Sequence, residues 1–122
     1  MPSLHRPRPS PSEAKPPPEV RIVELRTEPW PDGRRIRVPL TLTAFQENPS
    51  LEVILTDDLG NEAARADIIE TAENRIVFTL HIRSRSASNA YQLTASITYP
   101  ETGTVDTKSI DFKLDPGSSG DA

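Results

Sequence analysis

Residue types that perform chemistry are few in this chain and do not converge. The 122 residues contain no cysteine and two histidines, so a thiolate nucleophile, a disulfide and a cysteine-ligated metal are all excluded. His5 lies in a proline-rich stretch and His81 stands alone in an alternating segment, which leaves no ligand set for zinc. No Gly-x-Ser-x-Gly elbow or glycine-rich phosphate loop occurs, and the carboxylates are spread over turns. We therefore expect no enzyme and no catalytic, cofactor or metal site.

One acidic pair has the composition of a calcium loop but not its spacing. Asp57 and Asp58 precede Leu59, Gly60 and Asn61. The alternating ligands and the distal glutamate of an EF-hand loop are absent. Glycine and asparagine tolerate positive φ, so this stretch favours a tight hairpin turn instead.

Arginine forms the one cluster with a recognisable binding chemistry. Two alternating segments, residues 35–45 and 75–83, carry arginine or histidine at polar positions, and antiparallel neighbours would bring the beginning of one beside the end of the other. Five side chains would then share one corner: Arg35, Arg37, His81, Arg83 and Arg85. Arginine binds carboxylates and phosphates through paired hydrogen bonds. Recognition of an anionic partner is therefore one hypothesis, and a solvated salt-bridge network with the nearby Glu24, Glu28 and Asp32 is the other.

Short β-strands are the elements that would position these residues. In residues 75–83 and 91–99, apolar side chains alternate with mostly polar ones, so each segment presents one apolar face. A turn-forming Ser-Arg-Ser-Ala-Ser-Asn run separates the two segments. Residues 35–45, 51–55 and 105–114 show similar alternation. Each of these segments therefore predicts a half-buried strand.

Two further segments are less regular. Residues 20–27 change parity between Ile22 and Val23, which indicates a bulge or a strand shared between two sheets. Residues 62–70 predict a strand, although a short helix capped by Asn61 is an open alternative because the segment has helix propensity.

About seven short strands joined by turns predict an all-β fold, an antiparallel two-sheet sandwich. Trp30 lies in a proline-rich turn, and we expect it to cap one end of the core. The inward positions of the strands should form one core between the sheets: Ile36, Val38, Leu40, Leu42, Leu51, Val53, Ile76, Phe78, Leu80, Leu93, Ile97, Ile110 and Phe112.

Three motifs carry a resemblance to a known family. They are the turn Leu55-Thr-Asp-Asp-Leu-Gly-Asn61, the strand start Tyr91-Gln-Leu-Thr-Ala95 and the hairpin Tyr99-Pro-Glu-Thr-Gly-Thr104. On these motifs, residues 20–114 resemble a bacterial immunoglobulin-like or fibronectin type III-like domain. The resemblance implies an immunoglobulin-like sandwich in which Tyr91 is the corner tyrosine. Neither an antibody-type core nor integrin binding is implied, because the chain lacks a cysteine pair and an Arg-Gly-Asp turn.

The ends of the chain differ from its middle in composition. We expect a disordered proline-rich tail or linker over residues 1–19, the sandwich over 20–115 and a flexible end over 116–122. The net charge of -4 argues against nucleic acid as a partner, and no apolar run predicts a transmembrane segment. If the chain is complete, we expect it in the cytoplasm; if it is a fragment of a longer protein, its location is open.

Sheet surface is the remaining candidate for function. Five residues fall on the outward parity of the predicted strands and form a weakly charged surface: Ile54, Ile69, Thr94, Ser96 and Thr98. Such a surface favours association with another protein or with a second copy. The leading hypothesis is therefore a non-catalytic protein-interaction or spacer module that acts through a sheet face or edge.

Overall fold

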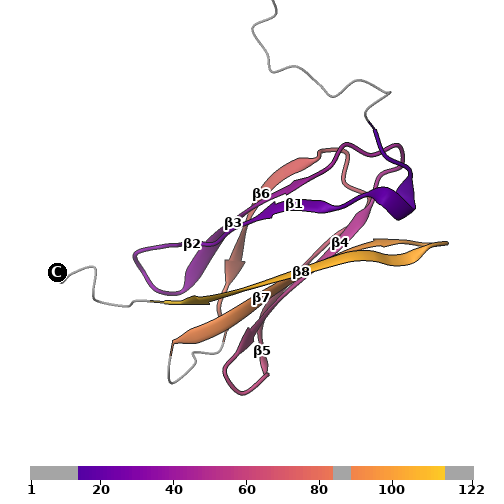
Figure 1. The fold of residues 1–122 in the computed structure, drawn as a ribbon. Helices are drawn as coiled ribbons and strands as arrows, with labels where there is room; N and C mark the ends of the chain where they lie inside the picture. Colours follow the sequence, from indigo (N-terminus) through magenta and orange to yellow (C-terminus); the bar gives the residue numbers. More distant parts are fainter. Residues whose placement is uncertain (1–13, 84–88, 115–122) are drawn as a thin grey trace, which may run out of the picture.

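A computed structural model describes residues 14–83 and 89–114, which form two antiparallel β-sheets packed face to face (Figure 1). The first sheet contains four strands: β1 (Ile22–Leu25), β2 (Glu28–Pro29), β3 (Arg35–Leu42) and β6 (Arg75–His81). The second contains four strands: β4 (Ser50–Asp57), β5 (Glu62–Ile68), β7 (Ala90–Tyr99) and β8 (Gly103–Lys113). The predicted two-sheet sandwich is confirmed.

The strand order gives each sheet a centre and two edges. In the first sheet, β1 and β2 pair with one side of β3, and β6 pairs with the other side. The order in the second sheet is β5-β4-β7-β8. Two contacts join the sheets at opposite sides of the sandwich. The Ile22 amide donates to the Asp106 carboxylate (2.8 Å), and the Arg83 amide donates to the Ala63 carbonyl (2.8 Å).

The core lies where the alternation of apolar residues places it. Ile36, Val38 and Leu93 are fully buried, and most of the other predicted core residues are buried with them. Four predicted members are only partly buried: Ile76, Phe78, Ile110 and Phe112. They lie on β6 and β8, which are edge strands, so a neighbouring strand covers them on one side alone.

The irregular first strand contains a bulge. The β1–β3 register shifts between Ile22 and Glu24, and the intervening Val23 is 59% exposed. Of the two explanations for the change in parity, the bulge is therefore the correct one, because β1 pairs only within the first sheet.

The expectation that Trp30 caps the core is wrong. Glu28 pairs with Arg37 and Pro29 with Ile36, so the next residue, Trp30, lies opposite the outward-facing Arg35. The Arg35 guanidinium lies over the indole, 4.0 Å from the ring centroid. This cation–π contact holds Trp30 on the outer face of the sheet.

The predicted hairpins are present. Gly60 (φ +85°) lies in the β4–β5 turn and Gly103 (φ +82°) follows the β7–β8 turn, both in the left-handed region that glycine adopts without strain. The Asp57 carboxylate accepts the amides of Leu59 (2.9 Å) and Asn61 (2.8 Å), which fixes the first turn. Residues 62–68 form a strand, β5, rather than the alternative helix.

Contacts with the sandwich begin before the boundary that the proline content suggests. The Lys15 amide donates to the Ala44 carbonyl, and the Gln46 amide donates to the Lys15 carbonyl (both 2.9 Å). A short 3₁₀ turn, Pro17–Glu19, leads from there towards β1. The expected tail and C-terminal end lie mainly outside the described residues, so the domain limits stay a prediction. Over the ranges 14–83 and 89–114, no helix is long and apolar enough to cross a membrane.

Candidate functional site

The outer face of the second sheet brings together four of the five predicted surface residues, Ile54, Thr94, Ser96 and Thr98, while Ile69 lies just beyond the end of β5. In register, Ile54 lies beside Thr94, and Thr94 lies beside Ser109. The adjoining row contains Glu52, Ser96 and Thr107. We call the uncharged part of this surface the hydroxyl face: Ser50, Ile54, Thr94, Ser96, Thr98, Thr107 and Ser109.

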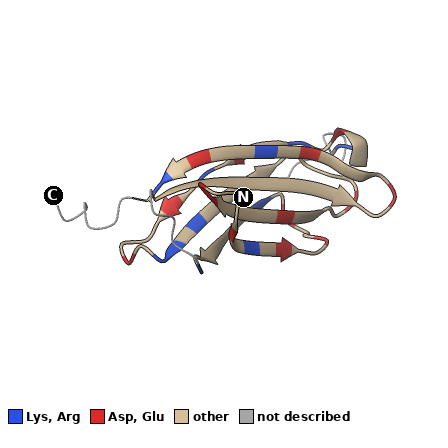
Figure 2. Ribbon diagram, turned by 90° about the horizontal axis from the view of Figure 1, so that it is seen from below, with Lys and Arg blue, Asp and Glu red and all other residues tan. Residues whose placement is uncertain are grey.

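Charge on this sheet is concentrated beside the hydroxyl face rather than on its central strand. Figure 2 shows β7 without a charged residue along its whole length, while β5 and β8 carry both signs. The face therefore has an uncharged strip between charged edge strands. Ile69, which follows β5 directly, is 73% exposed.

The hydroxyl groups of this face are satisfied within the sheet. The hydroxyl oxygens of Thr94 and Ser109 lie 2.9 Å apart, and those of Ser96 and Thr107 lie 3.2 Å apart. The Thr98 hydroxyl donates to the Ser50 carbonyl (3.5 Å). Because these groups already have partners, covering them costs less than burying unpaired hydroxyls would.

At the β5 margin, one arginine joins three carboxylates, which the sequence alone did not reveal. Arg65 forms salt bridges with Asp67 and Glu62 (3.2 Å each) and with Glu52. The hydrogen bond with Asp67, followed by the attraction of Glu62 and Glu52, raises the pKa of Arg65. Asp67 and Glu62 lie two and three residues from Arg65 on the same strand, whereas Glu52 lies thirteen residues away and is brought there by the β4–β5 register.

The arginine corner forms as the topology predicted, but acidic neighbours occupy most of it. Arg35 lies opposite His81 in the β3–β6 ladder. Three salt bridges neutralise the cluster: Arg35 with Asp32 (2.9 Å), Arg37 with Glu28 (3.7 Å) and Arg83 with Glu62 (3.0 Å). Arg85 lies outside the described residues.

Asp32 is held in its charged form at this corner. Its carboxylate accepts the backbone amide of Arg34 (2.9 Å) and the side chain of Arg35 (2.9 Å). The Arg34 amide bond, with the Arg35 side chain as a smaller cause, lowers the pKa of Asp32. The carboxylate therefore organises the turn and balances Arg35 at the same time.

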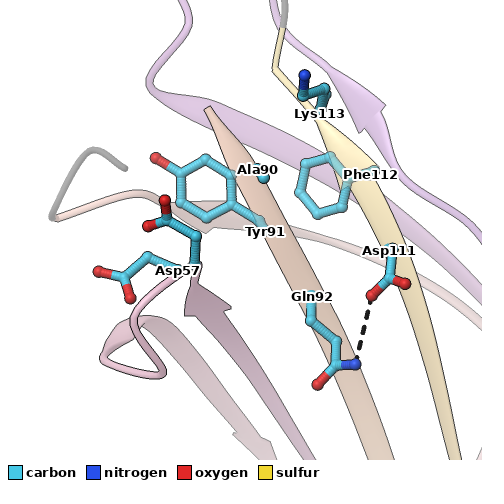
Figure 3. Close-up of a pocket in the computed structure, with 8 residues that line it drawn as sticks. Asp57, Ala90, Tyr91, Gln92, Asp111, Phe112 and Lys113 are labelled. Carbon is cyan, nitrogen blue, oxygen red and sulfur yellow. Dashed lines mark hydrogen bonds between the residues drawn. The ribbon is translucent and has the colours of Figure 1, made fainter. Parts of the chain in front are cut away.

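A pocket of about 510 Å³ opens at one end of the second sheet, where sequence reasoning placed no site (Figure 3). Its walls come from the ends of β4, β7 and β8 and from the following turn: Asp57, Asp58, Ala90, Tyr91, Gln92, Asp111, Phe112 and Lys113. The rings of Tyr91 and Phe112 stack with centroids 5.7 Å apart. The Gln92 amide donates to Asp111 (3.3 Å).

Two acidic side chains of the pocket already accept hydrogen bonds. Asp57 is engaged by the amides of its own turn, and Asp111 is engaged by Gln92. Within the described part of the chain, no group of three histidine or acidic side chains could hold a metal ion. No sequence signal could have revealed this pocket, because three strand ends far apart in the chain form it.

Comparisons with known proteins identify the fold. No family model matches the chain, and no curated protein does. Among solved structures, a β-glucuronidase from Bifidobacterium dentium is similar over 78% of this chain and 18% of its own, with a TM-score of 0.61 and 13% identity. A glycosyl hydrolase family 2 member from Bacteroides cellulosilyticus is similar over 78% of this chain and 15% of its own, with a TM-score of 0.57 and 12% identity.

A third structure, a β-glucuronidase from Ruminococcus gnavus, is similar over 80% of this chain and 16% of its own, with a TM-score of 0.53 and 19% identity. The likeness shows the fold. At these identities it shows a β-sandwich and nothing of the chemistry. The chain spans less than a fifth of each of these proteins.

Proposed function

We propose that this chain is a non-catalytic module that joins or spaces proteins, with the hydroxyl face as its contact surface. The observation that carries the proposal is the uncharged outer face of β7, whose Thr94 and Ser96 hydroxyls pair with those of Ser109 and Thr107 on β8. A partner can cover a surface of this kind without burying an unpaired charge. Ile54 and Ile69 add apolar area to it.

The fold comparison supports a module within a larger assembly. In the similar glycosyl hydrolase and β-glucuronidases, the matched region is less than a fifth of the chain, so the same fold serves there as one part among others. We extend this to the present chain and assign it to the immunoglobulin-like or fibronectin type III-like group. The strand order, with the four strands β1, β2, β3 and β6 facing β5-β4-β7-β8, supports the assignment.

Affinity purification from the native cell with variant baits tests the contact surface. We expect wild type and a Leu59→Asp control to recover the same protein, since Leu59 is 81% exposed in a turn away from the face. Ile54→Asp should lose this protein, because a carboxylate buried in the contact weakens affinity by about tenfold or more. Circular dichroism should show the same fold for all three baits. Equal recovery with Ile54→Asp, or recovery of no protein by any bait, would contradict the proposal.

A second candidate, recognition of an anionic partner, is favoured by the adjacency of Arg35 and His81. Among the described residues of this corner, Arg34 and His81 form no salt bridge, so they remain available to an anionic partner. Titration with acidic peptides, nucleic acid and anionic lipid vesicles at low salt should then show binding that Arg37→Glu, Arg83→Glu abolishes. Failure of wild type to bind any of them would leave the corner as a salt-bridge network.

A further inference from the structure

The edge of β6 is open in the part of the chain that the structure describes, where β6 pairs with β3 alone. The Ile82 amide donates to the Arg34 carbonyl, and the Leu42 amide donates to the Asn74 carbonyl (2.7 Å each). These bonds flank the strand, so its even-numbered residues direct their peptide groups to β3. The peptide groups of Arg75, Val77 and Thr79 therefore point away from the sheet.

Apolar side chains gather at this edge. Ile76 and Phe78 face the core but remain partly exposed, although their alternation predicts full burial. Val77, on the outer face, is 53% exposed. Because β6 is the edge strand of the first sheet, no neighbouring strand covers Ile76, Val77 and Phe78 on their open side among the described residues.

The other sheet edges carry protection that β6 lacks. β8 has charges along its length: Asp106, Lys108, Asp111 and Lys113. β5 carries Glu62, Arg65 and Asp67, and the β1–β2 edge is interrupted and contains a bulge and a proline. Between its terminal residues, β6 reads Ile-Val-Phe-Thr-Leu, without a charge, proline or glycine. Unprotected strands of this composition pair readily with another strand.

We propose that a second copy of this chain pairs edge to edge with β6, antiparallel, about a two-fold axis at Val77. Val77 then lies opposite the partner's Val77, and Arg75 lies opposite the partner's Thr79. Every outward peptide group of residues 75–79 gains a partner in this register. The Arg83–Ala63 contact closes the strand beyond His81, which limits the pairing to this segment.

The register is also compatible in side chains and charge. Ile76 meets the partner's Phe78, so the half-exposed apolar residues cover one another. Arg75 faces a neutral threonine rather than a second arginine. The surface is distinct from the hydroxyl face, so this self-association goes beyond the function proposed above and can coexist with it.

Disulfide trapping tests the register directly, since the chain contains no native cysteine. Hydrogen-bonded residues in antiparallel strands have Cα atoms about 5.5 Å apart, which is within the range that a disulfide spans. We expect Val77→Cys to form a covalent dimer at least about tenfold faster than Val23→Cys, because pairing raises the local thiol concentration. Val23 is the matched control, exposed to 59% on another edge strand. Equal rates for Val77→Cys and Val23→Cys would overturn the proposal. So would a mixture of Val77→Cys and Thr79→Cys chains in which the mixed disulfide dimer forms faster than the Val77→Cys homodimer.

Sedimentation of the unmodified chain gives the second readout. Wild type and Val23→Lys should dimerise as concentration rises, whereas Val77→Lys should stay monomeric because two ammonium groups would meet at the axis. Val77 faces outward, so circular dichroism should show an unchanged fold. A wild-type chain that remains monomeric up to about 1 mM, where even a weak interface of about -4 kcal/mol would be populated, would overturn the proposal.

Discussion

Leu80 and Phe78 lie on the same face of β6, but only Leu80 is deeply buried, with 2% of its surface exposed. We expect Leu80→Ala to lower the free energy of unfolding by about 2–5 kcal/mol, since it leaves a cavity in the core. Val23→Ala, at an exposed position, should change it by less than about 0.5 kcal/mol. Urea denaturation of both variants measures the difference. Equal stability of the two would show that the inward assignment of β6 is wrong.

Tyr99 gives a prediction in pH at the same scale. Its hydroxyl donates to the Glu47 carbonyl (2.9 Å), and burial, with the nearby Glu47 charge as the smaller cause, raises the pKa of Tyr99. The folded state therefore holds the proton more tightly than the unfolded state, and the stabilisation present below about pH 10 is lost as pH rises above that value.

Tyr99→Phe removes both the hydrogen bond and the titration. At neutral pH we expect the variant to be less stable by about 0.5–1.5 kcal/mol. The gap to wild type should shrink as pH rises from about 9 to about 11, as measured by urea denaturation at each pH. A gap that grows with pH would reverse the assigned direction of the pKa shift.

Individual residues were predictable where alternation alone decides their direction. Ile36, Val38 and Leu93 follow that pattern to full burial. The position of Trp30 was not predictable in this way, because the β2–β3 register turns it outward over Arg35. No property of the sequence around Trp30 encodes that register. The contact of Arg65 with Glu52 was not predictable for the same reason, because it depends on the β4–β5 register.

At the scale of elements, the β4–β5 turn depends on one backbone conformation. Gly60 has a φ of +85°, and a Cβ placed there would meet no atom within 4 Å. Gly60→Ala should therefore destabilise the fold by about 1–2 kcal/mol through backbone strain alone. Thermal denaturation should show a lower Tm than wild type. An unchanged Tm would mean that the turn relaxes to another conformation at no cost.

Strands and hairpins were predictable because turn residues and period-two patterns are local. The β4–β5 and β7–β8 hairpins and the bulge in β1 are all where the sequence indicates them. The pocket was not predictable, since the ends of β4, β7 and β8 meet there only through tertiary pairing. The open edge of β6 was not predictable either, because it depends on how the strands divide between the two sheets.

For the whole molecule, the two sheets differ in where they expose polar and apolar surface. The described residues contain an uncharged central strand, β7, in one sheet and an unprotected edge, β6, in the other. Composition suggested a surface function, but only the assembled sheets show which surfaces are free of charge. The similar solved structures agree on the fold and extend no further.

Amide hydrogen exchange of the wild-type chain, resolved by residue, is the most direct measurement. In dilute solution, amides in the central strands β3, β4 and β7 should exchange slowly, and those of Val77 and Thr79 should exchange quickly because they face away from β3. In concentrated solution, the outward amides of β6, those of Arg75, Val77 and Thr79, should become protected, while the β8 edge stays unchanged. Equal exchange of Val77 and Thr79 at both concentrations, or weak protection of the central strands, would contradict a sandwich that associates through its sheet surface.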